Sequence, residues 1–406
     1  MSGKGTIFLV LGFSLIFMVA GRNFNNMATS TVDNFSSYFY DAKAHQIAAS
    51  GINLVLNQLF LNNSLADQTF TYSIDGGTVS VVLSTSSGRQ IISTSNYNST
   101  TATIKVGFKP SSFAKYAYFS DTEGANIWWT SNDTVWGPFH SNGQLRVADE
   151  PVFYGKVTID GSLVKYSNSA KPHFYGGIET GVHIDIPEDG VSNVASAATT
   201  SGAVFSGHSL VYLDFRGDSI RYKFSSSGSW TYKLASTFAP NGVIYAQDAE
   251  LRIKGNVKGQ YTIGVSGTGS NKGKVYIDDD IYYNTNPKTN SSSTDMLGIV
   301  AERDVVITDN TANNSNVNIQ AAIYCETGSF TAENYQTRAV SGSIYLYGGI
   351  TQYTRGAVGQ FTTDKSGNTT VKNGFSKRYR YDERLLLTSP PVFPGTGELE
   401  VVSWFE

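Results

Sequence analysis

Cysteine, proline and charge are all scarce in this sequence. The one cysteine, Cys325, excludes an internal disulfide framework. Charged residues make up only 16% of the chain and the net charge is −3, so the composition predicts no electrostatic attraction to nucleic acid. None of the 10 prolines lies in residues 6–60, so no proline breaks a helix there. The five histidines lack metal-ligand spacing, and we expect no metal site and no cofactor.

Aromatic residues, glycine and small polar residues take the place of the missing charges. The chain contains 24 Tyr, 23 Phe and 40 Gly, which is a composition typical of extracellular β structure with turns made by Gly and Asn. A chain of 406 residues is long enough for two or three folding units, and it can bury a core without disulfides.

The most informative segment is the uncharged run Thr6–Gly21 (TIFLVLGFSLIFMVAG), which lies between Lys4 and Arg22. As a helix it spans roughly 24 Å at about 1.5 Å per residue, against a hydrocarbon core of about 30 Å. One interpretation is a retained membrane helix with Lys4 on the cytoplasmic side. A second is a cleaved secretory signal, with Val19 and Gly21 as the small residues before the cut. A third interpretation comes from the residues that follow Gly21.

Apolar residues continue in a helical rhythm after the run. They recur at steps of three and four, with one longer gap, which predicts an amphipathic helix and an anchoring helical segment over residues 6–62. A cleaved signal gives no reason for such a long helix in phase with the apolar run. The residues of this stripe are Phe24, Ala28, Val32, Phe35, Phe39, Ala42, Ala49, Ile52, Leu56 and Leu59.

The short basic start that ends at Lys4-Gly5, the apolar helix after it and the segment Ala42–Phe60 resemble type IV pilin-like proteins, namely minor pilins and pseudopilins. The resemblance implies that residues 1–5 are a short leader, processed between Gly5 and Thr6. Thr6 stands where that family prefers Phe or Met, and Val10 stands where it usually has Glu. Membrane anchoring is therefore the expectation, and assembly into a filament stays open.

In residues 68–108 apolar and polar residues alternate, as they do in β-strands. The segment Thr69–Ile74 leads into Asp75-Gly76-Gly77, a strong hairpin signal. We expect an antiparallel meander of short strands that packs on the helix, which is the pilin-like order.

The remainder, residues 115–374, is predicted to be a large β body. Short strand-corner-strand units recur along it, and aligning them stacks Ser141, Ala246, Ala301, Cys325 and Leu346. Such a repeat predicts the rungs of a parallel β-solenoid; the alternative is a β-sandwich. We expect residues 375–406 to cap the body, and residues 186–201 and 284–294 to be mobile surface loops.

Several sequence segments of the body resemble an uncharacterised bacterial envelope family. Its members join a pilin-like N-terminus to a β domain of unknown function. The segments are WGPFHSNGQLRV, PVFYGKVT, YRYDERLL and PPVFPGTG. The resemblance implies an envelope location, and it supplies no active site.

Binding residues are sought among aromatic and basic side chains. Trp128, Trp129 and Trp136 are candidates for sugar stacking, with core anchors as the alternative. Arg378 and Arg380, in a basic run, are candidates for contact with an anionic glycan or a protein partner, with salt bridges to nearby acids as the alternative. We predict no catalytic residue.

The sequence therefore predicts a membrane-anchored, non-enzymatic bacterial surface or envelope protein with a structural or adhesive role. Its partners would be the membrane, other pilin-like subunits, and a surface glycan or protein. It would be a single-pass protein with a cytoplasmic N-terminus and the body outside the cytoplasm, or part of a surface filament. The alternative is an anchored carbohydrate-active enzyme on a β-solenoid that uses Asp278 and Asp280 as acid and base.

Overall fold

The computed structural model describes residues 3–62, 65–84 and 89–406. The chain divides into two units, each with its own core. The small unit consists of the residues up to Pro110 together with Glu398–Glu406, and the body consists of Ser111–Gly397. The mainly β fold with a long N-terminal helix, predicted from the sequence, is confirmed.

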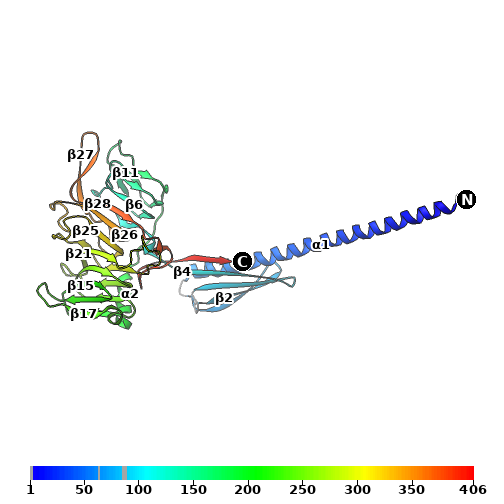
Figure 1. The fold of residues 1–406 in the computed structure, drawn as a ribbon, viewed down its shortest axis with the longest axis horizontal. Coiled ribbons are helices and arrows are strands. Elements are labelled where there is room, and N and C mark those ends of the chain that lie inside the picture. Colours follow the sequence, from blue (N-terminus) through cyan, green and yellow to red (C-terminus); the bar gives the residue numbers. More distant parts are fainter. Residues whose placement is uncertain (1–2, 63–64, 85–88) are drawn as a thin grey trace. The chain divides into compact units, whose positions relative to one another are not determined.

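Helix α1 runs from Gly3 to Leu61, a length of 59 residues (Figure 1). The large apolar side chains between Ile7 and Val19 are 53–75% exposed, and α1 is long and apolar enough to cross a membrane by length and composition. Gly5 and Thr6 lie inside this helix rather than before it. Residues 1–2 of the predicted leader lie outside the described residues.

Only the C-terminal part of α1 is buried. The predicted apolar stripe is divided accordingly: Ile52 and Leu59, in the part expected to pack on the sheet, are buried, whereas Phe24 and Phe35 are about 70% exposed. The physical reason is that the sheet of the small unit covers only the last turns of the helix. The buried residues of α1 are Ala44, Ile47, Ala48, Gly51, Ile52, Val55 and Leu59.

The sheet of the small unit has five strands in the order β1-β2-β3-β4-β29. Neighbours from β1 to β4 are antiparallel. The hairpin between β1 and β2 turns at Asp75 and Gly76, whose φ angles of +51° and +83° suit the tight turn that the sequence predicts. The strands are β1 Gln68–Ile74, β2 Gly77–Ser84, β3 Gln90–Tyr97, β4 Thr100–Ser112 and β29 Gly395–Phe405.

Close contact between helix and sheet depends on Gly51. A Cβ atom there would lie 2.8 Å from a methyl carbon of Val79 and 2.9 Å from one of Val81. Beside it, the hydroxyl of Ser93 donates to the carbonyl of Ala48 at 2.8 Å, so a buried polar group is satisfied by the helix backbone.

Residues 375–406, which the sequence predicts to cap the body, do not form one segment. The structure divides this stretch: strand β28 (Thr369–Arg380) belongs to the body, while β29 is the outer strand of the small sheet. The backbone groups of β4 would otherwise form an open edge, which β29 covers. The chain therefore crosses between the units twice.

The body is built from short strands. In its first part these are β5 Tyr118–Thr122, β6 Thr134–Trp136, β7 Phe139–Ser141, β8 Leu145–Val147, β9 Val152–Phe153, β10 Val157–Ile159, β11 Leu163–Lys165, β12 His173–Phe174 and β13 Ile178–Thr180. The middle part has α2 Gly190–Ser201, β14 Ala203–Phe205, β15 Leu210–Gly217, β16 Ser219–Lys223, β17 Thr231–Leu234, α3 Ala235–Phe238, β18 Val243–Ala246, β19 Glu250–Val257, β20 Gln260–Val265 and β21 Lys274–Tyr283. The last part has β22 Met296–Ala301, β23 Val305–Ile307, β24 Val317–Cys325, β25 Phe330–Ala332, β26 Val340–Thr354, β27 Gly359–Thr363 and β28, with 3-10 turns at Phe113–Lys115 and Glu383–Leu386.

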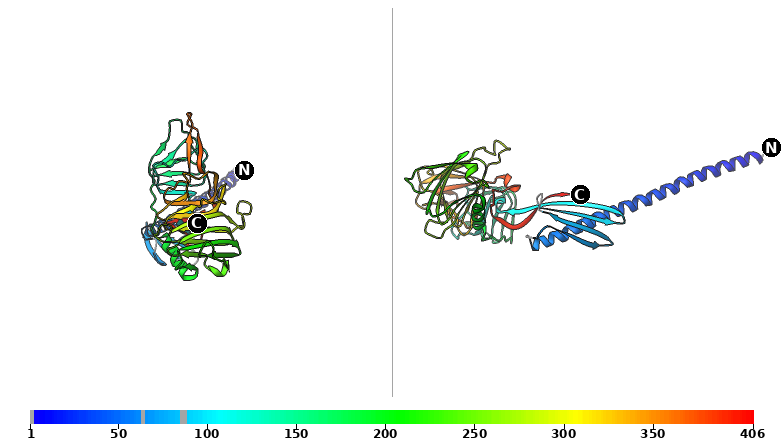
Figure 2. Two further views of the ribbon diagram at one scale, coloured as in Figure 1. Left: turned by 90° about the vertical axis from the view of Figure 1, so that its left-hand side faces the viewer. Right: turned by 90° about the horizontal axis from the view of Figure 1, so that it is seen from below.

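Parallel pairing dominates the body. One ladder runs β14-β18-β20-β22-β24-β26-β5-β7-β10-β13 and is parallel throughout. A second runs β24-β26-β28-β6-β9-β12, and a third runs β15-β19-β21-β23-β25. Figures 1 and 2 show the strands of the body in layers, from β15 and β17 at one end to β11 at the other. Antiparallel pairs are confined to β15-β16-β17 and the β27-β28 hairpin.

The order of the layers does not follow the order of the chain. Strand β26 has β24 on one side and β5, from the start of the body, on the other. In the first ladder Ser141, Ala246, Ala301 and Cys325 share one column, as predicted, because Cys325 pairs with Gln352, Gln352 with Ser120 and Ser120 with Ser141. The partner of Cys325 in β26 is Gln352 and not Leu346, so the predicted alignment is wrong for that unit.

Candidate functional site

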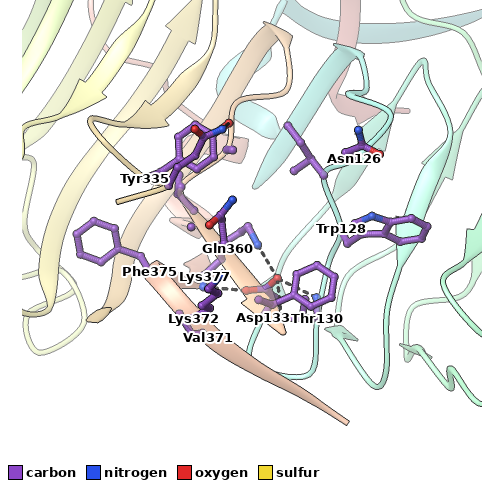
Figure 3. Close-up of a pocket in the computed structure, with 16 residues that line it drawn as sticks. Asn126, Trp128, Thr130, Asp133, Tyr335, Gln360, Val371, Lys372, Phe375 and Lys377 are labelled. Carbon is purple, nitrogen blue, oxygen red and sulfur yellow. Dashed lines mark hydrogen bonds and ion pairs between the residues drawn. The ribbon is translucent and has the colours of Figure 1, made fainter. Parts of the chain in front are cut away.

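One pocket of the body lies between the segment after β5 and the β27-β28 hairpin. Its volume is about 410 Å³. Figure 3 shows Trp128 and Tyr335 on opposite sides with Gln360 between them. We call it the Trp128 pocket, and it is lined by Asn126, Ile127, Trp128, Thr130, Asp133, Tyr335, Gln336, Ala357, Val358, Gly359, Gln360, Phe361, Val371, Lys372, Phe375 and Lys377.

A neutralised ion pair forms one wall of the Trp128 pocket. The carboxylate of Asp133 accepts from Lys377 Nζ at 2.5 Å and from the backbone N–H of Lys377 at 2.9 Å (Figure 3). Burial lowers the pKa of Lys377, and Asp133 opposes that effect. The remaining lining carries amide side chains, aromatic rings and the exposed Lys372.

Trp129 is not part of this pocket. Its side chain is fully buried, with Arg355 4.5 Å and Lys377 5.0 Å from its ring centroid. Arg355 in turn pairs with Glu123 at 2.8 Å inside the body. Of the sequence alternatives, the structure gives Trp129 the role of a core anchor; neighbouring residues of an extended chain point to opposite sides, which is why Trp128 alone reaches the pocket.

A second pocket collects three of the predicted residues. We call it the Arg380 pocket; it has a volume of about 340 Å³ and is lined by Trp136, Lys288, Tyr345, Leu346, Arg378 and Arg380. Along β28, Lys377 and Tyr379 are buried, while Arg378 is partly exposed and Arg380 exposed. Strand alternation therefore divides the basic run into an inward half and an outward half.

The cations of the Arg380 pocket are weakly compensated. Arg378 donates to the hydroxyl of Thr134 at 2.5 Å. The ammonium of Lys288 lies 4.5 Å from the ring centroid of Tyr347. Burial, and next the charge of Arg380, lower the pKa of Lys288, while the charges of Glu383 and Asp382 oppose this shift. The lining itself holds three cations and no acid, which suits a bound anion.

Trp136 ends a row of exposed aromatic rings. Its ring stacks on Tyr154 with centroids 5.6 Å apart, and Tyr154 stacks on Tyr175 at 5.1 Å. Trp136 is the last residue of β6, and Tyr154 and Tyr175 directly follow β9 and β12, which are parallel to it in turn. Parallel pairing in register repeats the same position at each layer, and this produces the stack.

The acids near the basic run have other partners. Asp382 is buried and holds Arg384 through both oxygens, at 2.6 Å and 2.9 Å. Within the described residues no ion pair links Asp382 or Glu383 to Arg378 or Arg380. The predicted alternative, salt bridges to these acids, therefore holds for Arg384 and not for the two outward arginines.

The two aspartates of the enzyme alternative lie at the corner where β21 passes from one ladder to another. Asp278 accepts from Arg252 at 2.5 Å and from Thr308 at 2.8 Å. Asp280 accepts from Tyr282 at 2.6 Å and from the backbone N–H of Asn318 at 2.6 Å. The two carboxylates share no partner and each is already bonded.

Within the described residues no group of three His, Cys, Asp or Glu side chains could hold a metal ion. Sequence reasoning missed Lys288 and Tyr345, which complete the Arg380 pocket. Tyr345 pairs in register with Arg378, and only the strand pairing, not the sequence, brings them together.

Comparisons with known proteins give three findings. A family model described as "Domain of unknown function (DUF4900)" matches residues 78–162, from β2 in the small unit to the loop after β10 in the body. No curated protein matches. Among solved structures, the competence-associated pilin ComZ from Thermus thermophilus is similar with 13% identity and a TM-score of 0.37, over 90% of this chain and 97% of that one. Since that likeness is slight, we base the proposals below on this chain's own residues.

Proposed function

We propose that this chain is a membrane-anchored, non-enzymatic, pilin-like surface protein of a bacterial envelope, with a structural or adhesive role. Helix α1 inserts its first part in the membrane with Lys4 on the cytoplasmic side, and the body lies outside the cytoplasm. The single observation that carries the proposal is the division of α1 into an exposed apolar N-terminal part and a C-terminal part buried on a sheet.

The apolar side chains of residues 7–19 make exposure to water unfavourable in free energy. Each costs about 1.5–3 kcal/mol to leave in water rather than bury, and nothing within the described part of the small unit covers them. A lipid bilayer, or the apolar helices of other pilin-like subunits, would cover them. Pilin-like processing between Gly5 and Thr6 belongs to this proposal, because that peptide bond lies on the exposed helix.

For the body we propose a parallel β-solenoid. The support is the three parallel ladders, in which successive layers repeat the same positions in register. A solenoid presents long rows of side chains on its faces, and the row that ends at Trp136 is such a surface. The non-enzymatic part of the proposal is supported by the separate, already bonded positions of Asp278 and Asp280.

Membrane fractionation of the full-length chain tests the anchor. The wild type is expected in the membrane pellet after a salt or carbonate wash and in solution after detergent. Changing Leu9→Lys and Leu15→Lys, which are both 60% exposed in the apolar run, should release it, since charges at mid-membrane cost about 2.5–3.5 kcal/mol each.

The matched control places the same charges beyond the run. Val32→Lys and Phe35→Lys change residues that are 63% and 70% exposed in the same helix, and this variant should stay in the pellet. A wild-type chain that is freely water-soluble and monomeric, with its N-terminus intact by mass, would exclude the anchor. A mature N-terminus at Thr6 would support pilin-like processing, and a start at Arg22 or beyond would exclude it.

A further inference from the structure

We propose that the Arg380 pocket binds the carboxylate-bearing sugar of an acidic polysaccharide, with Arg378 and Arg380 holding the carboxylate and Trp136 packing on the sugar ring. This deepens the proposed function, and it rests on it in one respect: such a glycan is met only if the body lies outside the cytoplasm.

The charge of the Arg380 pocket favours an anionic ligand. Its lining contains Lys288, Arg378 and Arg380 and no acid. Arg380 and Lys288 take part in no ion pair within the described residues. Guanidinium groups bind carboxylates by paired, charge-assisted hydrogen bonds, so two outward arginines in one strand form a suitable cradle.

The aromatic rings favour a sugar over a bare phosphate. Tyr154 covers one face of the Trp136 indole. Strand β6 lies between β9 and β28, and Trp136 pairs in register with Arg380. The opposite indole face therefore points toward β28 and the pocket. A flat aromatic face suits the C–H groups of a pyranose ring, whereas a bare phosphate would gain nothing from it.

The strand pairing separates a glycan from an acidic peptide. Peptides commonly add to a sheet through a free strand edge. Arg378 and Arg380 lie in a strand paired on both sides, with β26 and with β6. No backbone edge is available at this pocket, and recognition must use side chains alone.

The volume of the Arg380 pocket and the row of aromatic rings beside it indicate the size of the ligand. A volume of about 340 Å³ is at the small end of ligand sites and fits one or two sugar units. Beyond Trp136 the exposed rings of Tyr154 and Tyr175 continue along the same face at one ring per layer. Their edges offer contact to the further units of a chain, and the ligand class is therefore a polymer rather than a single sugar.

Isothermal titration of the full-length protein in neutral detergent micelles tests this inference. The probes are oligogalacturonate and its methyl ester, which has the same sugars without the negative charge. The acid form should bind and the ester should bind at least about tenfold more weakly. Binding of the acid form should weaken with added salt.

Variants identify the pocket. R378A/R380A should lose at least about tenfold in affinity for oligogalacturonate. K165A/K365A removes the same charge at two exposed lysines outside both pockets and should bind as the wild type does. W136A should weaken the binding of oligogalacturonate and leave the weak binding of inorganic phosphate unchanged. Circular dichroism checks folding, and R380Q replaces the double variant if that one unfolds.

Four results would overturn the inference: no binding of oligogalacturonate, equal binding of its ester, an equal loss in K165A/K365A, or polyphosphate or polyglutamate binding as tightly as the uronate. The last would mark a general anion site or a peptide site. Fractionation tests the anchor separately, so a soluble chain that still binds the uronate would overturn the proposed location and not the pocket.

Discussion

At the scale of single residues, strand parity decides which predicted side chains can meet a ligand. The sequence predicts a basic run and a tryptophan pair as candidate contacts, but parity sends Lys377 and Trp129 inward and Arg378 and Trp128 outward. Alternation itself can be predicted from sequence. Which parity faces the core depends on strands far away in the chain, and for that reason the candidate site could be predicted only in part.

Two histidines of the body show opposite electrostatic environments. His183 lies on the surface, where its ring nitrogens contact Asp160 at 2.8 Å and Asp185 at 3.2 Å, and the hydrogen bond to Asp160 chiefly raises its pKa. His140 is buried, with Thr158 at 2.7 Å and Asn142 at 2.8 Å, and burial chiefly lowers its pKa.

We predict that NMR titration places the midpoint of His183 above 6.5 and that of His140 below it. The stabilisation from His183 is full below pH 6.5 and is lost as the pH rises through its raised pKa. That from His140 is present above pH 6.5 and is lost as the pH falls through its lowered pKa. Asp160→Asn should lower the midpoint of His183 and leave His140 the lower of the two. Midpoints in the reverse order would contradict the environments described.

At the scale of elements, local signals predict well where the chain's own neighbours decide the conformation. The hairpin at Asp75-Gly76 and the helix over residues 6–60 follow from turn chemistry and from the absence of proline. The loop predicted over 186–201 is wrong for residues 190–201, which form α2. Val191, Val194 and Ala198 are buried there, so tertiary packing stabilises a helix that small polar residues alone do not indicate.

The contact of α1 with the small sheet gives a prediction at this scale. Gly51→Leu should destabilise the small unit by about 1–3 kcal/mol, because its side chain would collide with Val79 and Val81. The measurement is hydrogen exchange of β2 and β3 in the detergent-solubilised chain, which should become faster. The control Gly12→Leu makes the same change where no atom lies within 4 Å of the added Cβ, and it should leave that exchange unchanged. Equal exchange in both variants would contradict the close approach at Gly51.

At the scale of the whole molecule, the stacking order is what the sequence does not reveal. The repeated strand-corner-strand units can be recognised locally, and four of the five aligned positions do share a column. The return of β5 to the side of β26 cannot be recognised, since it joins residues more than two hundred apart whose pairing has no local signal.

A cross-linking experiment checks this order. Thr122 and Thr354 pair in register across β5 and β26, so the variant Thr122→Cys/Thr354→Cys should form an intramolecular cross-link on mild oxidation or with a short bis-maleimide. Thr122→Cys/Thr231→Cys, with the second cysteine in β17 at one end of the layers and β5 inside the stack between β26 and β7, should not (Figure 1). Cys325 is fully buried and burial raises its pKa, which keeps it out of the reaction. Equal yields in both variants would contradict the layer order.

Strands β4 and β29 are neighbours in one sheet, yet all of the body lies between them in the chain. The body is thus inserted between two neighbouring strands of the small sheet. During biosynthesis β29 is translated after the whole body. The edge of β4 therefore stays without β29 until the body has left the ribosome. The same arrangement allows evolution to change the inserted body while the small unit stays as it is.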